Sequence, residues 1–171
     1  FRIPGSVSFA EAVFAEPLSI AYYAVQLSAL QEGNKLAVLG AGPIGDSVLI
    51  SARESGAGDI YATDKIDSRL AIAGKLGAKL VYNVLKVDPV KEISSEEPGL
   101  LDIVFECCGQ QEALDQAIDL LKPGGKLIIV GIPEFDRWSF QADTARRKEI
   151  SIVHVRRQNN CTQKAIDMIE T

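Results

Sequence analysis

Three glycines stand in the segment GAGPIG, where an apolar run meets a helical pattern. Gly40 allows a tight turn, Gly42 lets the backbone approach a pyrophosphate closely, and Gly45 lets a helix pack against a strand. A helix that begins here presents free N–H groups and the positive end of its dipole to an anion. Pro43 stands near the first helical position, where its missing N–H costs little, and Ile44 follows it. This turn, with Pro43 and Ile44, is therefore a predicted site for the pyrophosphate of a dinucleotide.

A carboxylate, Asp64, ends the second predicted strand about 20 residues after the turn. A carboxylate at this position can accept hydrogen bonds from both hydroxyls of a ribose, and it repels a 2′-phosphate. Asp64 therefore predicts NAD rather than NADP as cofactor, although the adjacent Lys65 could compensate the charge. The alternative role of Asp64 is to cap the next helix, but Asp67 and Ser68 are better placed for that.

A second carboxylate, Asp46, directly follows the third glycine. In the first turn of a helix it interacts favourably with the dipole, typically by about 0.3–1 kcal/mol, and we favour this interpretation. The alternative is that Asp46 lies near the pyrophosphate and weakens its binding by charge repulsion. The direction of the side chain decides between the two.

These residues need a framework that brings them to one place. Short segments rich in Val and Ile are typical of strands buried on both faces. Such segments are 36–39, 59–63, 80–82, 102–106, 126–130 and 150–155. Helical patterns alternate with them at 16–30, 43–55, 67–76, 89–94, 111–121 and 161–170.

This alternation predicts an α/β fold, a Rossmann-type doubly wound parallel sheet of about six strands with helices on both faces. A glycine-rich connection without a ligand is the alternative for the GAGPIG turn, and this surrounding pattern disfavours it. Gly124 and Gly125 are expected at the opposite edge of the sheet, as the exit turn of a helix.

Composition excludes several classes of function. The formal net charge is −5, so binding to nucleic acid is not expected. No apolar stretch is long enough to span a bilayer, so membrane association is not expected either. The three cysteines are an odd number without the spacing of a metal site, which favours a reducing, cytoplasmic setting.

Both ends of the chain are typical of a piece of a longer protein. The chain does not begin with Met, and its last segment has no Gly or Pro to end a helix. We expect a lead-in segment and connecting helix from a missing catalytic domain at 1–30. An NAD-binding Rossmann domain is expected at 31–160, and the start of a truncated C-terminal helix at 161–171.

Five segments, in their order and spacing, resemble the cofactor-binding domain of zinc-dependent medium-chain dehydrogenases of the alcohol dehydrogenase superfamily. They are AEPLSIAYYAV, LAVLGAGPIG, ATDKIDSRLAIAGKLGA, FECCG and KPGGKLIIVGIP. The most similar group is that of the sorbitol, xylitol and threonine dehydrogenases. The resemblance implies NAD as cofactor and zinc in the full-length enzyme. It also implies a preceding barrel-like domain with Cys and His-Glu zinc ligands, which are absent from this chain, since its one histidine is His154.

The resemblance implies roles for three further residues. Glu16 in EPLS matches the family's carboxylate at the catalytic zinc, which binds the metal directly or through its water. From the sequence alone, a first-turn helix carboxylate is the better interpretation of Glu16. Arg157 in RRQNN resembles the arginine that reaches toward substrate and metal water, with Arg156 as the alternative register. Arg69 matches the arginine beside the adenosine ribose, with a surface helix position as the alternative.

Two further turns match the family's cofactor site. Cys107, Cys108 and Gly109 resemble the E-C-T-G turn beside the adenosine half of the cofactor, with Cys108 in place of Thr. Small buried residues at a strand end explain this cysteine pair better than a redox or metal site does. Gly131 and Ile132 follow the fifth strand, at the edge where open α/β sheets bind ligands, and we expect the nicotinamide there.

The last predicted strand contains His154, and family members pair through the corresponding edge strand. An exposed strand of this kind is otherwise an aggregation risk. We therefore expect a homo-oligomer, a dimer or tetramer, that forms through this strand. A lone histidine in such a strand is more often a core or interface residue than a catalytic one.

Together these observations predict the NAD-binding domain of a zinc-dependent alcohol or polyol dehydrogenase. The full-length enzyme would transfer hydride from a secondary alcohol to NAD, with zinc lowering the pKa of the alcohol. The isolated chain is expected to bind cofactor without turnover. The alternatives are a methyltransferase that uses S-adenosylmethionine, whose turn usually has a glycine where Ile44 stands, and a non-catalytic NAD-binding module. A zinc-free quinone reductase relative is a near variant that Asp64 disfavours, because such relatives commonly use NADP.

Overall fold

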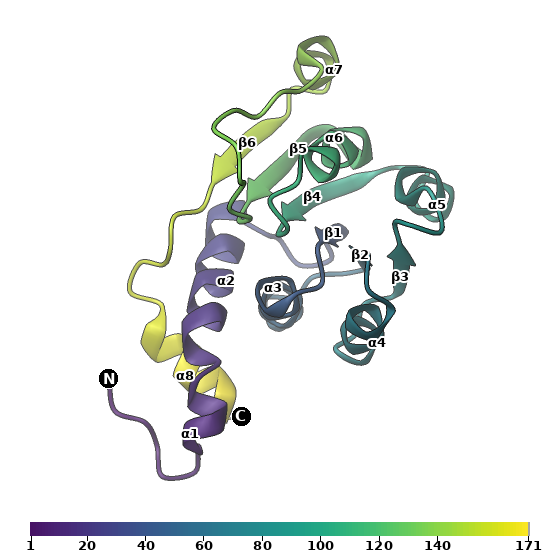
Figure 1. Cartoon of the computed structure of the whole chain (residues 1–171). Coiled ribbons are helices and arrows are strands. Elements are labelled where there is room, and N and C mark those ends of the chain that lie inside the picture. The colour runs from purple at the N-terminus through teal and green to yellow at the C-terminus, as the bar shows by residue number, and fades with distance from the viewer. Residues whose placement is uncertain (171) are drawn as a thin grey trace.

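The computed structural model describes residues 1–170, and within them a six-stranded parallel sheet carries helices on both faces (Figure 1). The strand order is β3-β2-β1-β4-β5-β6. The strands are β1 (Leu36–Leu39), β2 (Ile60–Asp64), β3 (Leu80–Asn83), β4 (Leu101–Glu106), β5 (Leu121–Ile129) and β6 (Ser151–His154). The predicted α/β, Rossmann-type doubly wound fold is confirmed. The strand order reverses between β1 and β4, and their carboxyl ends border the crevice where such sheets bind ligands.

Helices form the crossovers, precede the first strand and follow the last. They are α1 (Phe9–Ala12), α2 (Ala15–Ser28), α3 (Pro43–Glu54), α4 (Asp67–Lys75), α5 (Pro89–Glu96), α6 (Gln111–Leu120), α7 (Ala142–Arg147) and α8 (Thr162–Glu170). Helices α2, α3 and α4 cover one face of the sheet, and α5 and α6 cover the other (Figure 1). The two shortest helices, α1 and α7, are not predicted by the sequence pattern.

The strands at the centre of the sheet are buried on both faces, which explains their continuous apolar sequence. Every side chain of β1 and β2 is buried. In β1, Leu36 and Val38 join the core cluster beneath α2, α3 and α4, whereas Ala37 and Leu39 join the cluster beneath α5 and α6. Alternate side chains of one strand therefore stabilise two separate layers.

The fifth strand begins earlier than the sequence predicts. Gly124 and Gly125, expected as a helix exit turn, lie inside β5, so that prediction is wrong. The pairing of β5 with β4 shifts register between Leu121 and Lys126, which is where the two glycines stand. Gly124 has a φ of +76°, and its N–H donates to the carbonyl of Lys148 at 2.7 Å. Glycine is favoured wherever the backbone adopts a left-handed conformation, in an irregular strand as much as at the end of a helix. The local sequence therefore does not distinguish a bulged strand from a helix exit turn.

The start of α4 also differs from the prediction. Its N-cap residue is Ile66, and no side chain caps the helix. The Asp67 carboxylate instead accepts hydrogen bonds from Asn83 Nδ2 and Lys86 Nζ, both at 2.7 Å. The prediction that Asp67 or Ser68 caps this helix is therefore wrong. The Asp67 side chain binds Asn83 and Lys86, which are distant in sequence, instead of the first N–H groups of α4.

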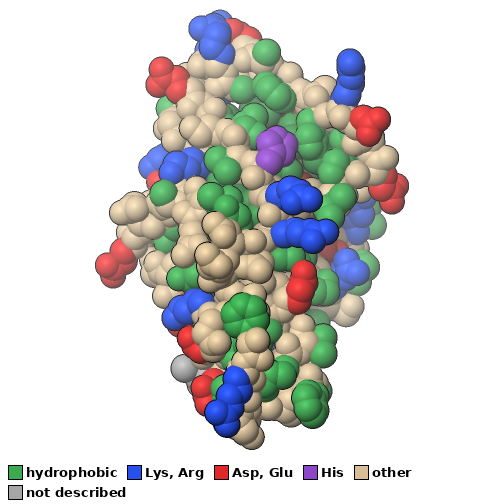
Figure 2. Space-filling view, turned by 90° about the vertical axis from the view of Figure 1, so that its left-hand side faces the viewer, with side chains coloured by type: hydrophobic (Ala, Val, Ile, Leu, Met, Phe, Trp, Pro, Cys, Tyr) green, Lys and Arg blue, Asp and Glu red, His purple; other side chains and the backbone are tan. Residues whose placement is uncertain are grey.

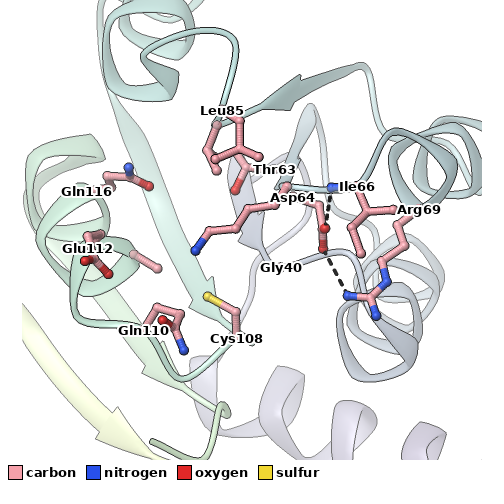
Figure 3. Close-up of a pocket in the computed structure, with 13 residues that line it drawn as sticks. Gly40, Thr63, Asp64, Ile66, Arg69, Leu85, Cys108, Gln110, Glu112 and Gln116 are labelled. Carbon is pink, nitrogen blue, oxygen red and sulfur yellow. Dashed lines mark hydrogen bonds and ion pairs between the residues drawn. The ribbon is translucent and has the colours of Figure 1, made fainter.

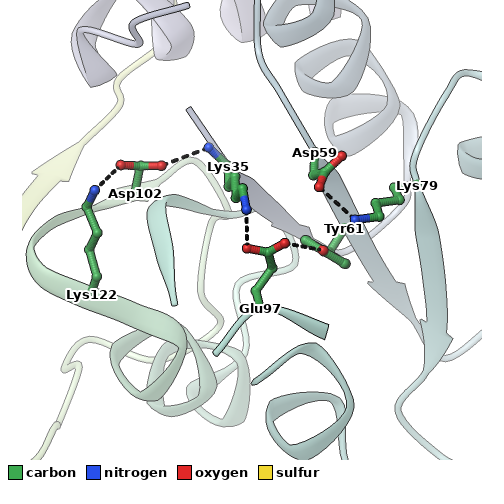
Figure 4. A network of polar contacts seen from close by, with 7 residues as sticks. All are labelled: Lys35, Asp59, Tyr61, Lys79, Glu97, Asp102 and Lys122. Atoms are coloured by element: carbon green, nitrogen blue, oxygen red, sulfur yellow. Dashed lines mark hydrogen bonds and ion pairs between the residues drawn. The ribbon is translucent and has the colours of Figure 1, made fainter. Parts of the chain in front are cut away.

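A polar cluster closes the amino ends of the strands, opposite the crevice (Figure 4). Buried Glu97 accepts hydrogen bonds from Lys35 Nζ at 2.6 Å and from the Tyr61 hydroxyl at 3.2 Å. Asp102 accepts the main-chain N–H of Lys35 at 2.8 Å and forms an ion pair with Lys122. Burial raises the pKa of Tyr61 to about 12, so its hydroxyl stays protonated and donates. Glu97 is therefore a buried carboxylate with a partner on each oxygen.

The two ends of the described chain lie side by side along α2 (Figure 1). The hydroxyl of Ser6 donates to the carboxylate of Glu170 at 2.6 Å. Thr171, the last residue of the expected 161–171 segment, lies outside the described residues. None of the helices in residues 1–170 has the length and apolar character needed to cross a membrane.

Candidate functional site

The carboxyl ends of the central strands border a cavity of about 520 Å³ (Figure 3). The cavity lies at the reversal of strand order, where doubly wound sheets bind their ligands. Of the predicted cofactor residues, Gly40, Asp64, Arg69 and Cys108 line it. The turns after β1 and β4, the end of β2 and the first part of α4 thus meet in one hollow.

The glycine turn has the geometry that its spacing predicts. Gly40 has a φ of +104°, and a Cβ there would lie 2.9 Å from Cys108 Cβ. A Cβ on Gly45 would overlap the carbonyl oxygen of Gly40. Around Gly42, by contrast, a Cβ would meet only Arg69 Nη1, at 3.9 Å, so an approaching group finds open space. Helix α3 begins at Pro43 with no side-chain cap, which leaves its positive end available to an anion.

The Asp64 carboxylate is tied to the glycine turn while it lines the cavity (Figure 3). Its Oδ2 accepts the N–H of Ala41 at 2.9 Å, and its Oδ1 accepts the N–H of Ile66 at 2.9 Å. Arg69 Nη1 lies 3.8 Å from Oδ2. Each carboxylate oxygen has two acceptor positions, so the group can still accept hydrogen bonds from a ligand. The two backbone hydrogen bonds hold the Asp64 carboxylate in a fixed position at the cavity, where a ligand could reach it.

The charge of Asp46 is disfavoured, contrary to the helix-dipole interpretation. Its Oδ1 is buried and has no hydrogen-bond partner. Burial, followed by repulsion from Asp64, raises the pKa of Asp46 to about 6, against an opposing effect of Arg69. Desolvation and a neighbouring carboxylate therefore outweigh the dipole, which is worth at most about 1 kcal/mol on an exposed surface.

We expect Asp46→Asn to stabilise the protein at neutral pH. The folded-state pKa lies above the ordinary value of 3.8. The contribution of Asp46 to wild-type stability therefore falls as the pH rises from about 4 to about 6, and the loss persists above that range. After allowance for partial exposure, the substitution should raise the free energy of unfolding by about 1 kcal/mol at pH 7.5 and by almost nothing at pH 4. Urea denaturation at the two pH values measures the difference.

Asp67→Asn is the matched control for this prediction. Asp67 is also a first-turn carboxylate, but Lys86 and Asn83 lower its pKa. Its neutral variant should lose stability at pH 7.5, which is the opposite sign. If Asp46→Asn also destabilised the protein at pH 7.5, the dipole would be the dominant influence on Asp46 after all.

The paired cysteines, Cys107 and Cys108, lie directly beside the glycine turn. Burial raises the pKa of Cys107 well above its ordinary range. Cys108 is exposed at the cavity, yet desolvation by the surrounding protein and the nearby Glu106 carboxyl raise the pKa of its thiol to about 12. Both thiols are therefore protonated and weakly nucleophilic. The N–H groups of Cys108 and Gly109 donate to the Glu106 carboxyl at 2.8 and 2.6 Å. Cys107 is half-buried and Cys108 is exposed at the cavity, so the interpretation of the pair as small buried residues is wrong for Cys108.

Gly131 and Ile132 lie next to this turn, outside the cavity wall. The N–H of Gly131 donates to the main-chain oxygen of Glu106 at 2.9 Å. A Cβ on Gly109 would lie 2.5 Å from the Ile132 carbonyl, so the two turns touch backbone to backbone. The Ile132 side chain is 90% exposed. The structure thus brings these two residues to the same edge as the glycine turn.

One wall of the cavity is not predicted by the sequence. It comes from the start of α6 and the segment after β3, with Gln110, Glu112, Gln116 and Leu85 (Figure 3). Glu112 and Gln116 are four residues apart, a spacing that places both on one face of a helix. That spacing is the one sequence signal for this wall, and it does not say which cavity the face borders.

The comparisons with known proteins agree with this geometry. A family model described as zinc-binding dehydrogenase matches residues 43–171. The chain belongs to this family. Sorbitol dehydrogenase of Bacillus subtilis (strain 168) is 34% identical over 171 residues, which cover 99% of this chain and 48% of that protein. The resemblance to zinc-dependent dehydrogenases of the sorbitol dehydrogenase-like group is confirmed, and it favours a dehydrogenase over a methyltransferase.

Solved structures of dehydrogenases superpose on nearly the whole chain. The 2R,3R-butanediol dehydrogenase of Bacillus subtilis matches with a TM-score of 0.91 and 31% identity, over 99% of this chain and 49% of that one. A zinc-binding dehydrogenase of Sinorhizobium meliloti 1021 bound to NADP matches with a TM-score of 0.93 and 26% identity, over 99% and 51%. The chain spans about half the length of the curated relatives it matches.

In this member of the family, the residues predicted for zinc and substrate lie outside the cavity wall. Glu16 is exposed in the first turn of α2. Arg157 is exposed after β6, with a φ of +58°. In the described part of the chain, no three His, Cys, Asp or Glu side chains are grouped so that they could hold a metal ion. These residues do not form a zinc site by themselves, and the roles of Glu16 and Arg157 stay predictions.

Proposed function

We propose that this chain is the NAD-binding domain of a zinc-dependent alcohol or polyol dehydrogenase. The observation that carries the proposal is the position of Asp64, which lines the cavity and is hydrogen-bonded to Ala41 of the glycine turn. A ribose bound to Asp64 and a pyrophosphate bound to the turn would then lie next to each other. The open space at Gly42 and the uncapped start of α3 fit an anionic group there.

The chain's own residues would bind and orient the cofactor. The turn from Gly40 through Pro43 and Ile44 to Gly45 would hold the pyrophosphate, while Asp64 and Arg69 would hold the adenosine ribose. The turns at 107–109 and 131–132, which touch each other, would border the adenosine and nicotinamide parts. NAD, when bound, supplies the hydride-accepting ring.

The rest of the reaction belongs to the whole protein. In this proposal, residues 1–30 connect the domain at 31–160 to a catalytic domain, and 161–171 continue beyond it. Zinc ligands would come from that catalytic domain, with Glu16 approaching the metal and Arg157 the small-molecule alcohol or polyol. The described residues do not form a metal site, so this chain alone should bind cofactor without turnover. The three cysteines are free of disulfides, and we propose a cytoplasmic setting on that ground.

We also propose that the protein pairs with a second copy through β6. This strand is last in the sheet order, so one of its edges has no partner strand among residues 1–170. Its side chains range from half-buried to exposed, and His154 is exposed. Figure 2 shows hydrophobic side chains around the histidine on this side of the molecule. Pairing of this edge would protect it from aggregation.

Calorimetric titration with NAD, NADP and S-adenosylmethionine tests the cofactor assignment. We expect NAD to bind at least about tenfold more tightly than NADP, because Asp64 accepts ribose hydroxyls and repels a 2′-phosphate. If the chain bound NADP and not NAD, the proposal that Asp64 selects NAD would be contradicted. Binding of S-adenosylmethionine alone would refute the dehydrogenase assignment for this chain, and binding of none of the three would refute an independent cofactor site.

A further inference from the structure

Glu106, the last residue of β4, accepts hydrogen bonds from both turns that follow β4 and β5. Its side chain is 0% exposed. Its Oε1 accepts the N–H groups of Cys108 at 2.8 Å and Gly109 at 2.6 Å. Its main-chain oxygen accepts the N–H groups of Val130 at 2.8 Å and Gly131 at 2.9 Å. One residue thus satisfies four donors in two separate loops.

These two turns and the glycine turn pack closely against one another at their glycines. A Cβ on Gly131 would lie 2.6 Å from Glu106 Oε2 and would overlap the backbone nitrogen of Gly109. A Cβ on Gly40 would lie 3.2 Å from the nitrogen of Cys108, which donates to Glu106. A small displacement of the 107–109 turn would therefore disturb both of its neighbours.

The second carboxyl oxygen of Glu106 distinguishes it from a residue that only fills the core. Oε2 is buried and has no hydrogen-bond partner. Leaving a buried carboxyl oxygen without a partner is unfavourable, and the preceding residues Val104 and Phe105 show that apolar side chains fit this strand. A carboxyl group is useful here because the turn at 107–109 directs two N–H groups inward, and an apolar side chain would leave both without an acceptor.

We propose that Glu106 is a positioning residue for the cofactor, holding the turns after β4 and β5 in the arrangement that receives it. This inference rests on the proposed function, because it assumes that the cavity edge binds NAD. Glu106 itself lies beneath the turns, so its carboxyl group acts through Cys108 and Gly109, and its main-chain oxygen through Gly131, rather than by contact with the cofactor.

The test compares three variants by their NAD dissociation constants and thermal midpoints. Glu106→Gln keeps an oxygen acceptor at the same reach, so we expect NAD affinity within about threefold of wild type. Glu106→Asn is one methylene shorter and Glu106→Leu has no acceptor. Both should weaken NAD binding by about tenfold or more, because the 107–109 turn loses its fixed arrangement before binding and disturbs the turns that pack against it. Rescue by glutamine and not by asparagine would identify the acceptor's reach as the cause.

Glu97 supplies the matched control, since it is a buried carboxylate at the opposite edge of the same sheet. Glu97→Leu should lower the thermal midpoint, because Lys35 and Tyr61 lose their acceptor, yet leave NAD affinity within about twofold of wild type. If Glu97→Leu weakened NAD binding as much as Glu106→Leu does, general destabilisation would explain both and the inference would be overturned.

Hydrogen exchange of the NAD-free wild type provides a test that needs no variant. The amide protons of Cys108 and Gly109 should exchange as slowly as those of β4, and rapid exchange would overturn the inference even if Glu106→Leu did not fold. If the wild type bound NAD and Glu106→Asn bound it equally well, the inference would fail while the proposed function stood. A wild type that bound no NAD would refute both.

Discussion

Gly45→Ala is expected to destabilise the protein by about 3 kcal/mol or more. The new Cβ would overlap the carbonyl oxygen of Gly40 and would lie 3.2 Å from Val38 Cγ1. Because the obstacle is backbone rather than a flexible side chain, α3 has to move away from β1, and the buried contacts between them weaken. Urea denaturation of wild type and variant measures the loss in the free energy of unfolding.

Gly74→Ala separates this close approach from the general effect of glycine in a helix. Gly74 lies in α4, and a Cβ there would meet nothing within 4 Å. Alanine should therefore stabilise the protein at this position by about 0.5–1 kcal/mol. If Gly45→Ala were also neutral or stabilising, the packing of α3 on the glycine turn would be looser than the structure indicates.

Asp64→Asn is expected to weaken NAD binding by about tenfold or more and to reduce the preference for NAD over NADP. The amide keeps one acceptor but places a donor where the carboxylate accepts the N–H of Ala41 or Ile66. The variant also removes the charge that would repel a 2′-phosphate. Calorimetric titration of both cofactors measures the two effects separately.

Asp59→Asn is the control for this second experiment. Asp59 precedes the same strand at its other end and pairs with Lys79 at 2.7 Å, outside the cavity wall. Its neutral variant should leave the affinity for NAD within about twofold of wild type. An Asp64→Asn variant that kept wild-type affinity and preference would remove Asp64 from the cofactor site.

The sequence was sufficient to predict the parallel sheet and the glycine turn, because both depend on patterns among neighbouring residues. Strands buried on both faces require continuous apolar runs, and β1 and β2 lie within one residue of their predicted bounds. The glycine spacing predicts a tight turn at Gly40, open space for a ligand at Gly42 and a close helix–strand contact at Gly45. The structure has all three. The position of Asp64 at the end of β2 also follows from the strand pattern.

Tertiary structure decided the features that depend on distant neighbours. Asp46 follows the rule for a first-turn carboxylate in sequence, but burial beside Asp64 disfavours its charge. Glu106 is one more strand residue in the sequence, and it becomes the shared acceptor of two loops only when β4 and β5 lie side by side. Likewise, Glu112 and Gln116 border the cavity because the fold brings α6 opposite Asp64. A residue's charge preference and partners depend on what surrounds it in space, and the folded chain alone supplies those surroundings.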